Sequence, residues 1–234
     1  MSAVERSNYP AFTGPRFDDI MFPASALREG IDGGNWTDVD ACSVDQLLAQ
    51  MTPDNARGNF DSSTVRMAFH FLPFYDDVTL LRVFDPYWRD EDLVHYYLIS
   101  NKKLFRLGGK IDQILEVNRT APVLITENNV LEYLKFFCFF NRNFKRVLYM
   151  LDNLNAPVLE PLHGRPAFDD LQKLATPPRI LYVHKGYMYL CEAFFLHKDA
   201  IFKGILSVLS SGYTNLEYME IALDGFPDCI DPRV

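Results

Sequence analysis

Three residues of this sequence, Glu192, His184 and His95, have side chains that could act as a general acid or base. Glu192 lies in an apolar segment with the residue alternation of a β-strand, where a carboxylate is expected to be paired or to have a raised pKa. A histidine exchanges its proton close to neutral pH, which suits it to acid–base chemistry. No spacing motif joins any two of the three, so they are separate catalytic candidates.

Glu192 also has a candidate partner for a purely structural ion pair. Lys203 lies on the next predicted strand, and a hairpin turn centred near Lys198 places residues 192 and 203 nearly opposite each other. The sequence therefore favours a cross-strand ion pair. The alternative is that Glu192 serves as a catalytic or ligand-binding acid in an aromatic-walled cavity.

The densest acidic cluster comprises Asp85, Asp90, Glu91 and Asp92, with Trp88 between them. Carboxylates at such short spacing could hold a hard cation such as Mg²⁺. The same composition is typical of a solvated loop between strands, and this is the interpretation that we favour. Trp88 is a candidate binding residue.

Metal and cofactor motifs are missing from the sequence. The histidines show no H-E-x-x-H or similar ligand spacing, and the phosphate-binding glycine motifs and the G-x-S-x-G motif are absent. The cysteines form no C-x-x-C pair, so neither a zinc site nor a disulfide framework is predicted, and a reducing cytosol is the simplest compartment. We therefore expect no metal and no cofactor. The cysteines are Cys42, Cys138, Cys191 and Cys229.

Composition and charge narrow the class of protein. Of the 234 residues, 48% are hydrophobic and 14% aromatic, which is typical of a globular chain with an aromatic-rich core. The formal net charge of −8 opposes binding to nucleic acid. No apolar run approaches the roughly 18–20 residues that a membrane helix needs, and the first residues lack the apolar core of a secretory signal. The sequence predicts a cytoplasmic protein that binds neither nucleic acid nor membranes.

The stretch "YLKFFCFFN" at Tyr133–Asn141 is the most unusual segment of the chain. Apolar residues at positions 130, 131, 134, 137 and 138 follow a helical spacing, which predicts a helix over 127–140 that packs on the core, with Thr126 as its cap. Phe136, Phe139 and Phe140 fall off this stripe. Either the helix is buried on both sides, which we favour, or these three residues bind a partner.

The fold class predicted from the whole pattern is α+β, with antiparallel β-meanders in one curved or two packed sheets. We divide the chain into an irregular arm (1–42), an α+β region (43–152), a loop-rich connection (153–178) and a second meander (179–234) in the same globular domain. A capping box at Ser43–Gln46 predicts a short helix, and a second helical piece lies at 169–175. Predicted strands lie at 64–71, 78–84, 93–100, 103–107, 111–117, 144–151, 179–184, 187–196, 200–209 and 216–223.

One part of the sequence resembles a family of uncharacterised bacterial proteins. The resemblance covers Leu93–Asn141 and rests on "YYLIS", "LFRLGG", "ILEVN" and "NNVLEYLKFFCFF", which includes the Y-L-x-F-F-C-F-F segment. The chain departs from the family pattern at residues 141–143, where Asn-Arg-Asn replaces an acidic turn with a glycine. The resemblance implies a bacterial, non-secreted protein and no known activity.

Two hypotheses of function follow. The first is a soluble, non-catalytic binding or interaction protein whose partner is an unknown protein or small molecule, with a homo-oligomer left open. The alternative is an enzyme of an unrecognised family that uses an acid/base residue in an aromatic-lined pocket. The state of Glu192 discriminates between them. A raised pKa in a deep pocket would favour the enzyme, whereas a filled core with Glu192 bonded to Lys203 would argue against it.

Overall fold

The computed structural model describes residues 36–51, 60–85, 94–101, 103–141, 148–155, 159, 162–197 and 199–225. Within these ranges the chain forms four α-helices and two antiparallel sheets of five strands each. The predicted α+β class with antiparallel meanders is confirmed. The strands form two separate sheets and not one curved sheet.

The first sheet is a meander in which neighbouring strands follow each other along the chain. Its central strands are mostly apolar and have buried side chains on both faces. Successive residues of a strand point to opposite sides, and the consecutive residues Leu80 and Leu81 are both fully buried. This sheet therefore requires a packed layer on each side. Its strands are β1 (Thr37–Asp38), β2 (Arg66–Phe71), β3 (Val78–Phe84), β4 (His95–Ser100) and β5 (Lys103–Arg106).

The second sheet has the order β10-β9-β8-β6, and β7 also pairs with β8. Lys185 and Gly186 link β7 to β8 with positive φ angles of 48° and 72°, as a tight hairpin turn requires. Three of the strands are ten residues long. The strands are β6 (Tyr149–Leu151), β7 (Arg179–His184), β8 (Met188–His197), β9 (Ala200–Leu209) and β10 (Thr214–Leu223).

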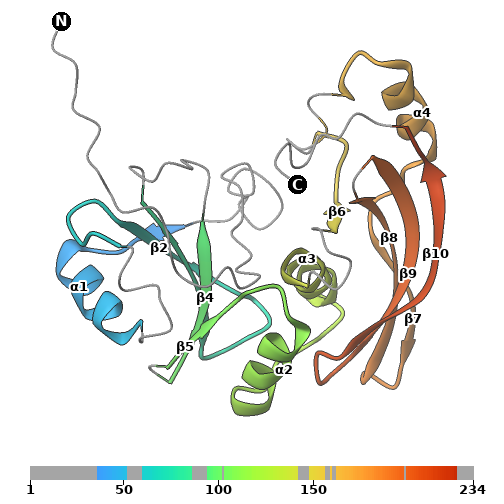
Figure 1. The fold of residues 1–234 in the computed structure, drawn as a ribbon. Coiled ribbons are helices and arrows are strands. Elements are labelled where there is room, and N and C mark those ends of the chain that lie inside the picture. Colours follow the sequence, from blue (N-terminus) through green and yellow to red (C-terminus); the bar gives the residue numbers. More distant parts are fainter. Residues whose placement is uncertain are drawn as a thin grey trace, which may run out of the picture.

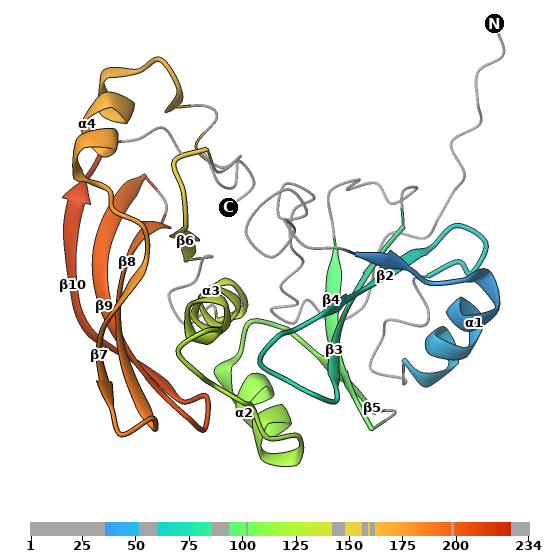
Figure 2. The same ribbon diagram turned by 180° about the vertical axis from the view of Figure 1, so that it is seen from behind.

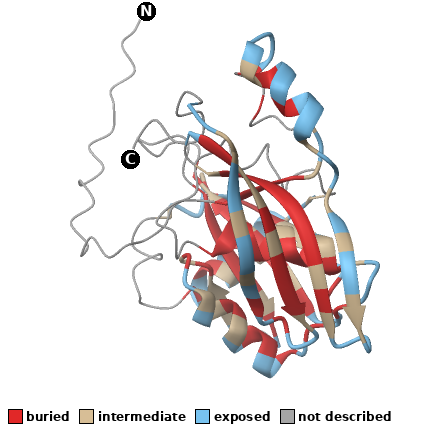
Figure 3. Ribbon diagram, turned by 90° about the vertical axis from the view of Figure 1, so that its right-hand side faces the viewer, coloured by how far each residue is buried: buried red, intermediate tan, exposed pale blue. Residues whose placement is uncertain are grey.

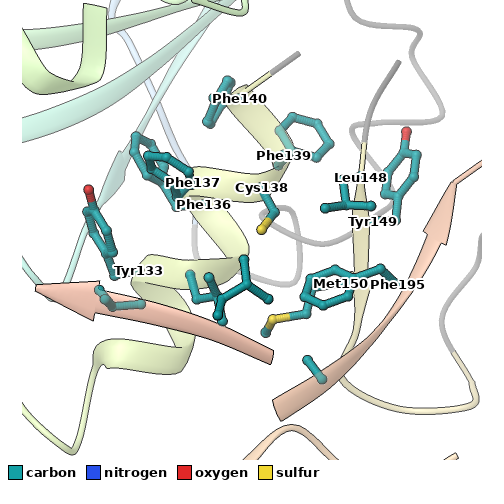
Figure 4. Close-up of a cluster of buried hydrophobic side chains, with 14 of the residues drawn as sticks. Tyr133, Phe136, Phe137, Cys138, Phe139, Phe140, Leu148, Tyr149, Met150 and Phe195 are labelled. Atoms are coloured by element: carbon teal, nitrogen blue, oxygen red, sulfur yellow. The ribbon is translucent and has the colours of Figure 1, made fainter. Parts of the chain in front are cut away.

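Helix α3 (Val130–Phe140) lies between the two sheets (Figures 1 and 2). Phe136, Phe139 and Phe140 are each no more than 2% exposed. The ring centroid of Phe140 lies 5.1 Å from that of Tyr96 in the first sheet. The ring centroid of Phe139 lies 5.8 Å from that of Tyr149 in the second sheet. Figure 4 shows Phe136, Phe139, Phe140 and Tyr149 at the helix. The prediction of a helix buried on both sides is confirmed, and only the narrow side that carries Glu132 is exposed.

The other helices complete the layers. Helix α1 (Ala41–Gln50) packs Val44 and Leu48 on the face of the first sheet that points away from α3. Helix α2 (Ile111–Thr120) lies beside α3, and α4 (Pro166–Leu174) lies at one end of the second sheet, where it contacts β10 (Figure 1). One continuous apolar core contains residues of both sheets and of α2, α3 and α4.

A buried polar network joins the layers. The hydroxyl of Tyr75 donates a hydrogen bond to Asn118 Oδ1 on α2. Asn118 Nδ2 donates to Tyr133 Oη (3.2 Å), and Tyr133 donates to the carbonyl of Gly212 (2.6 Å) in the β9–β10 turn. A Cβ at Gly212, whose φ is +81°, would lie 2.2 Å from Asn118 Nδ2. The network therefore requires glycine at this turn and fixes the turn against both helices.

One predicted strand is wrong, because residues 111–117 form most of α2. Ile114 and Val117 are three positions apart and both fully buried, so the segment has the spacing of a helix and not of a strand. The side chain of Gln113 accepts hydrogen bonds from the backbone N–H groups of Gly108 (2.7 Å) and Lys110 (3.4 Å), which stabilises the helix start. The high content of β-branched residues suggested a strand.

Other boundaries also differ from the prediction. Helix α1 begins two residues before Ser43, because Asp40 is the cap and accepts a hydrogen bond from the Ser43 backbone N–H (3.0 Å). The predicted arm 1–42 thus contains β1 and the start of α1. Of the predicted strand 144–151 only Tyr149–Leu151 is described as a strand, and residues 142–147 lie outside the described residues. The prediction of Thr126 as the cap of α3 is wrong, because residues 127–129 form a turn and the helix begins at Val130 with Asn129 at the N-cap position. Asn129 Oδ1 accepts a hydrogen bond from the Thr126 backbone N–H (2.7 Å), which closes that turn.

Candidate functional site

The three acid/base candidates do not converge on one site. His95 lies on β4 of the first sheet, whereas Glu192 and His184 lie on the second. His184 is directly opposite Met188, four residues from Glu192 along β8, a separation of about 13 Å at the usual rise of a strand. No two of these residues can therefore act on one substrate atom as neighbours.

His95 is a buried, neutral histidine. Its Nδ1 lies 3.1 Å from Arg106 Nη2, and the ring of Phe60 packs edge-on at 5.5 Å. Burial disfavours the imidazolium form and the charge of Arg106 repels it, so the pKa of His95 is lowered to about 3. Since Arg106 donates the hydrogen bond, Nδ1 is the acceptor. At neutral pH the imidazole is therefore uncharged, with its one proton on Nε2.

Glu192 is paired on both sides. Its Oε2 lies 3.0 Å from Lys203 Nζ, and its Oε1 lies 2.8 Å from Arg179 Nη2. Burial alone would raise the pKa of this carboxyl group, but the hydrogen bonds from Lys203 and Arg179 and their charges outweigh it and hold the pKa below its usual value. The predicted ion pair with Lys203 is confirmed. The lowered pKa is the opposite of what an acid catalyst at neutral pH requires.

The strand register explains why sequence reasoning found only one partner. Glu192 is directly opposite Ile205 on β9, and Lys203 is opposite Phe194, so the pair is diagonal and Lys203 lies two residues from direct opposition. Arg179 is directly opposite Glu192 on β7. A bulge between Ile180 and Tyr182 produces this pairing, because a regular hairpin would place Ile180 opposite Glu192. No glycine or proline in β7 marks the position of this bulge in the sequence.

His184 is half-buried at the end of β7. Its Nδ1 lies 3.1 Å from the hydroxyl of Tyr182, and its ring packs at 4.9 Å from that of Tyr187. Tyr182 and Tyr187 are about half exposed. His184 is thus part of an aromatic rim at one end of the second sheet.

Four charged residues form a row across the second sheet, and we call them the charged row: Arg179, Glu192, Lys203 and Glu220. Lys203 is directly opposite Glu220 on β10, just as Arg179 is opposite Glu192. Opposite residues of an antiparallel pair point to the same face. The charged row therefore crosses four neighbouring strands on one face, with the order positive, negative, positive, negative.

We call this side of the second sheet, which points away from α3, the outer face (Figure 3). Near α4 it is closed, since Leu196 and Ile201 are fully buried there. In the other half the aliphatic residues are only half-buried, and Tyr182 and Tyr218 are 52% and 50% exposed. In this half the outer face comprises Tyr182, His184, Met188, Leu190, Ile205, Ser207, Leu209, Asn215 and Tyr218 together with the charged row.

Both edges of this sheet are irregular. β7 has a bulge between Ile180 and Tyr182, and β10 has two, between Leu216 and Tyr218 and between Ile221 and Leu223. A bulge interrupts the regular spacing of N–H and C=O groups and so discourages the addition of another strand. The regular surface of the second sheet is therefore its face and not its edges.

Several predicted features lie partly outside the described residues. These include Trp88 with Asp90–Asp92, and Lys198. Asp85 is buried and accepts a hydrogen bond from the Thr64 hydroxyl at 2.5 Å, so this member of the acidic cluster is not a solvated loop residue. Within the described ranges no three His, Cys, Asp or Glu side chains are arranged to hold a metal ion.

Comparison with known proteins identifies no relative of this chain. No protein-family model, no curated protein and no solved structure matches the chain. None of the helices in the described part of the chain is long and apolar enough to cross a membrane. The outer face is consequently the candidate site on physical grounds alone: it combines exposed aromatic rings, half-buried aliphatic groups and a charged row on one rigid layer.

Proposed function

We propose that this chain is a non-catalytic interaction protein that binds a folded protein partner on its outer face. The observation that carries the proposal is the composition of this face, where half-buried aliphatic side chains lie beside the charged row and tyrosines lie on the two outer strands. Tyrosine and arginine are enriched in protein interfaces, which commonly combine apolar and polar contacts. A surface that served only solubility would not need to hold Leu190 and Ile205 half-exposed at its centre.

The rigidity of the face supports the same proposal. β8 and β9 are hydrogen-bonded along their whole length, and Gly204 leaves room for the ring of Phe195 beneath them, since a Cβ there would lie 2.9 Å from that ring. The outer face is thus held from below by the core. A preorganised surface loses little conformational entropy on binding, which favours association.

The shape of the site indicates what kind of partner fits. The bulged edges of β7 and β10 disfavour an extended peptide that would add a strand. The face itself is a sheet of hydrogen-bonded strands with charges of both signs in a fixed order. Such a surface suits another folded surface that presents aliphatic residues and the complementary charges.

We also propose that this protein resides in the bacterial cytoplasm. Its support is the sequence resemblance over Leu93–Asn141 and the state of the thiols. Cys138 and Cys191 are buried and free, and burial raises the pKa of the Cys191 thiol to about 12. Both thiols are therefore unreactive core groups, as in proteins that do not depend on disulfides.

A capture experiment with matched variants tests the proposal. The full chain, a Tyr182→Ser/Tyr218→Ser variant and a Phe71→Ser/Leu124→Ser control would be immobilised and exposed to extract of the cells that express the protein. Phe71 and Leu124 are also exposed, at 73% and 46%, but belong to other surfaces. We expect at least tenfold less of the bound protein on the outer-face variant than on the wild type and the control. Equal capture by all three chains would overturn the proposal.

A further inference from the structure

The charged row has a symmetry that the proposed binding function does not by itself require. From β7 to β10 the signs are positive at Arg179, negative at Glu192, positive at Lys203 and negative at Glu220. Read in the reverse direction, the same row is negative, positive, negative, positive. An even row of alternating charges is therefore complementary to its own reverse.

We infer that the folded partner is a second copy of this chain, docked outer face to outer face; the inference rests on the proposed binding function of this face. Because Lys203 and Glu220 lie two residues, about 7 Å, further along the strands than Arg179 and Glu192, the charged row runs obliquely across the sheet. A two-fold axis that passes between β8 and β9, in the plane of the interface and perpendicular to this row, reverses the order of the strands. It brings Arg179 towards Glu220 of the second copy and Glu192 towards Lys203 of the second copy. Each contact occurs twice, as in any isologous dimer.

The ion pairs within one chain leave room for these contacts. The side chain of Arg179 is 59% exposed and that of Lys203 is 36% exposed, although both are bonded to Glu192. An arginine has five N–H donors and a lysine has three, so each can contact a second carboxylate. Glu220 is exposed and accepts only the hydroxyl of Tyr218 among the bonds described (2.7 Å).

Aliphatic residues lie where the axis passes. Leu190 on β8 and Ile205 on β9 are both half-buried, and they flank the line between the two central strands. When two sheets stack face to face, side chains of the two inner faces interdigitate across about 10 Å. The dimer would therefore bury these aliphatic groups together with the rings of Tyr182 and Tyr218, which supplies the favourable free energy, while the charged row fixes the register.

The size of the face sets the expected strength of association. Four strands at about 4.8 Å spacing and about 25 Å of strand length correspond to roughly 500 Å² per copy, or about 1,000 Å² in total. That area is near the lower limit of specific interfaces. We therefore expect a reversible dimer with a dissociation constant in the micromolar range, and weaker association at high salt because exposed charges are screened.

The test is sedimentation equilibrium of the full chain over a range of concentrations, with two charge-reversal variants. Arg179→Glu brings a carboxylate against the carboxylate of Glu220 of the second copy. Glu220→Arg brings a guanidinium group against that of Arg179 of the second copy. We expect each variant alone to associate at least tenfold more weakly than the wild type. An equimolar mixture of the two variants restores both contacts, and we expect its association to return to within about threefold of the wild-type value.

A second pair of variants guards against loss of folding, since Arg179→Glu also puts a carboxylate beside Glu192. Ile205→Lys adds a lysine opposite Glu192, where the folded monomer can pair it but a stacked dimer must bury it. We expect at least tenfold weaker dimerisation with an unchanged circular dichroism spectrum. Phe71→Lys, on the first sheet, is the matched control and should dimerise like the wild type.

The outcomes separate the two proposals. A wild type that stays monomeric up to millimolar concentration, or a mixture of charge variants that fails to recover, overturns the second-copy inference. If the capture experiment then still shows a different protein whose binding depends on Tyr182 and Tyr218, the proposed binding function stands. If capture is also independent of the outer face, both proposals fall.

Discussion

The two sheets of this protein have the same number of strands and the same antiparallel pairing, but they differ in how many faces are covered. The first sheet is covered by α1 on one face and by α3 on the other, and most side chains of its central strands are buried. The charged side chain of its strand β3, Arg82, lies over the ring of Trp36. One face of the second sheet packs against α3, whereas over half of its length the opposite face is only partly buried and holds the charged row. A covered strand thus places a charge against a specific partner, whereas an open face can hold a row of charges.

A comparison within β8 makes the physical reason clear. Its inward Phe195 is fully buried in the apolar core, whereas its outward Glu192 is nearly as well buried but has two cationic partners. A carboxylate loses solvation when it is buried and must recover that free energy from hydrogen bonds and opposite charges. The first sheet meets the same constraint at His95 in another way, by keeping the imidazole neutral.

The largest expected effect contrasts the two faces of β8. Phe195→Ala removes a fully buried ring between α3 and the sheet and should lower the free energy of unfolding by about 3–5 kcal/mol. Leu190→Ala, on the half-buried outer side of the same strand, should cost about 1 kcal/mol because less apolar area returns to water. Urea unfolding of both variants measures the difference, and equal losses would contradict the assignment of the two faces.

The buried polar network gives the next largest effect. Tyr133→Phe keeps the ring but removes the hydroxyl that donates to Gly212 and accepts from Asn118. Both buried groups then lack this partner, so we expect a loss of about 1–3 kcal/mol. Tyr218→Phe, which removes an exposed hydroxyl of the second sheet, is the matched control and should change the stability by less than about 0.5 kcal/mol. Similar losses for both, again by urea unfolding, would argue against the network.

The neutral His95 predicts a pH dependence of the first sheet. Its folded-state pKa is lowered to about 3, so below the unfolded-state pKa of about 6.5 the unfolded chain binds a proton that the folded chain does not. Stability is therefore lost as the pH falls, by about 1 kcal/mol at pH 5.5 from this one group. His95→Gln should reduce the loss between pH 7.5 and 5.5 by that amount. An unchanged pH profile would show that His95 is protonated in the folded protein.

The ion pairs of Glu192 give the smallest expected effect on stability. Glu192→Gln should cost about 1 kcal/mol, because Arg179 and Lys203 are exposed enough to be solvated when the carboxylate is gone. The folded-state pKa of Glu192 is lowered, so the contribution is present above the unfolded-state pKa of about 4.3 and disappears as the pH falls below it. Unfolding at pH 7 and pH 3 measures this, and a larger cost at pH 3 would contradict it.

Periodicity and turn chemistry alone determined most of the elements. β3, β7 and β9 lie at their predicted positions, and Lys185-Gly186 forms a hairpin turn between two predicted strands. The strands are rich in β-branched, aromatic and other apolar residues, and the turn has glycine where φ is positive, so these constraints act over a few residues. The buried helix at "YLKFFCFFN" follows from the same local information, since an eleven-residue helix with only Glu132 and Lys135 charged needs cover on nearly every side.

Tertiary structure decided what the local pattern left open. α2 was mistaken for a strand because its β-branched residues suit either state, and only the burial of Ile114 and Val117 in the shared core selects the helix. Arg179 became the residue opposite Glu192 through the bulge between Ile180 and Tyr182, which shifts by one residue the register that the Lys185-Gly186 turn sets. The charged row and the outer face likewise exist only because four strands align, since a sequence specifies which residues alternate but not which strand lies beside which.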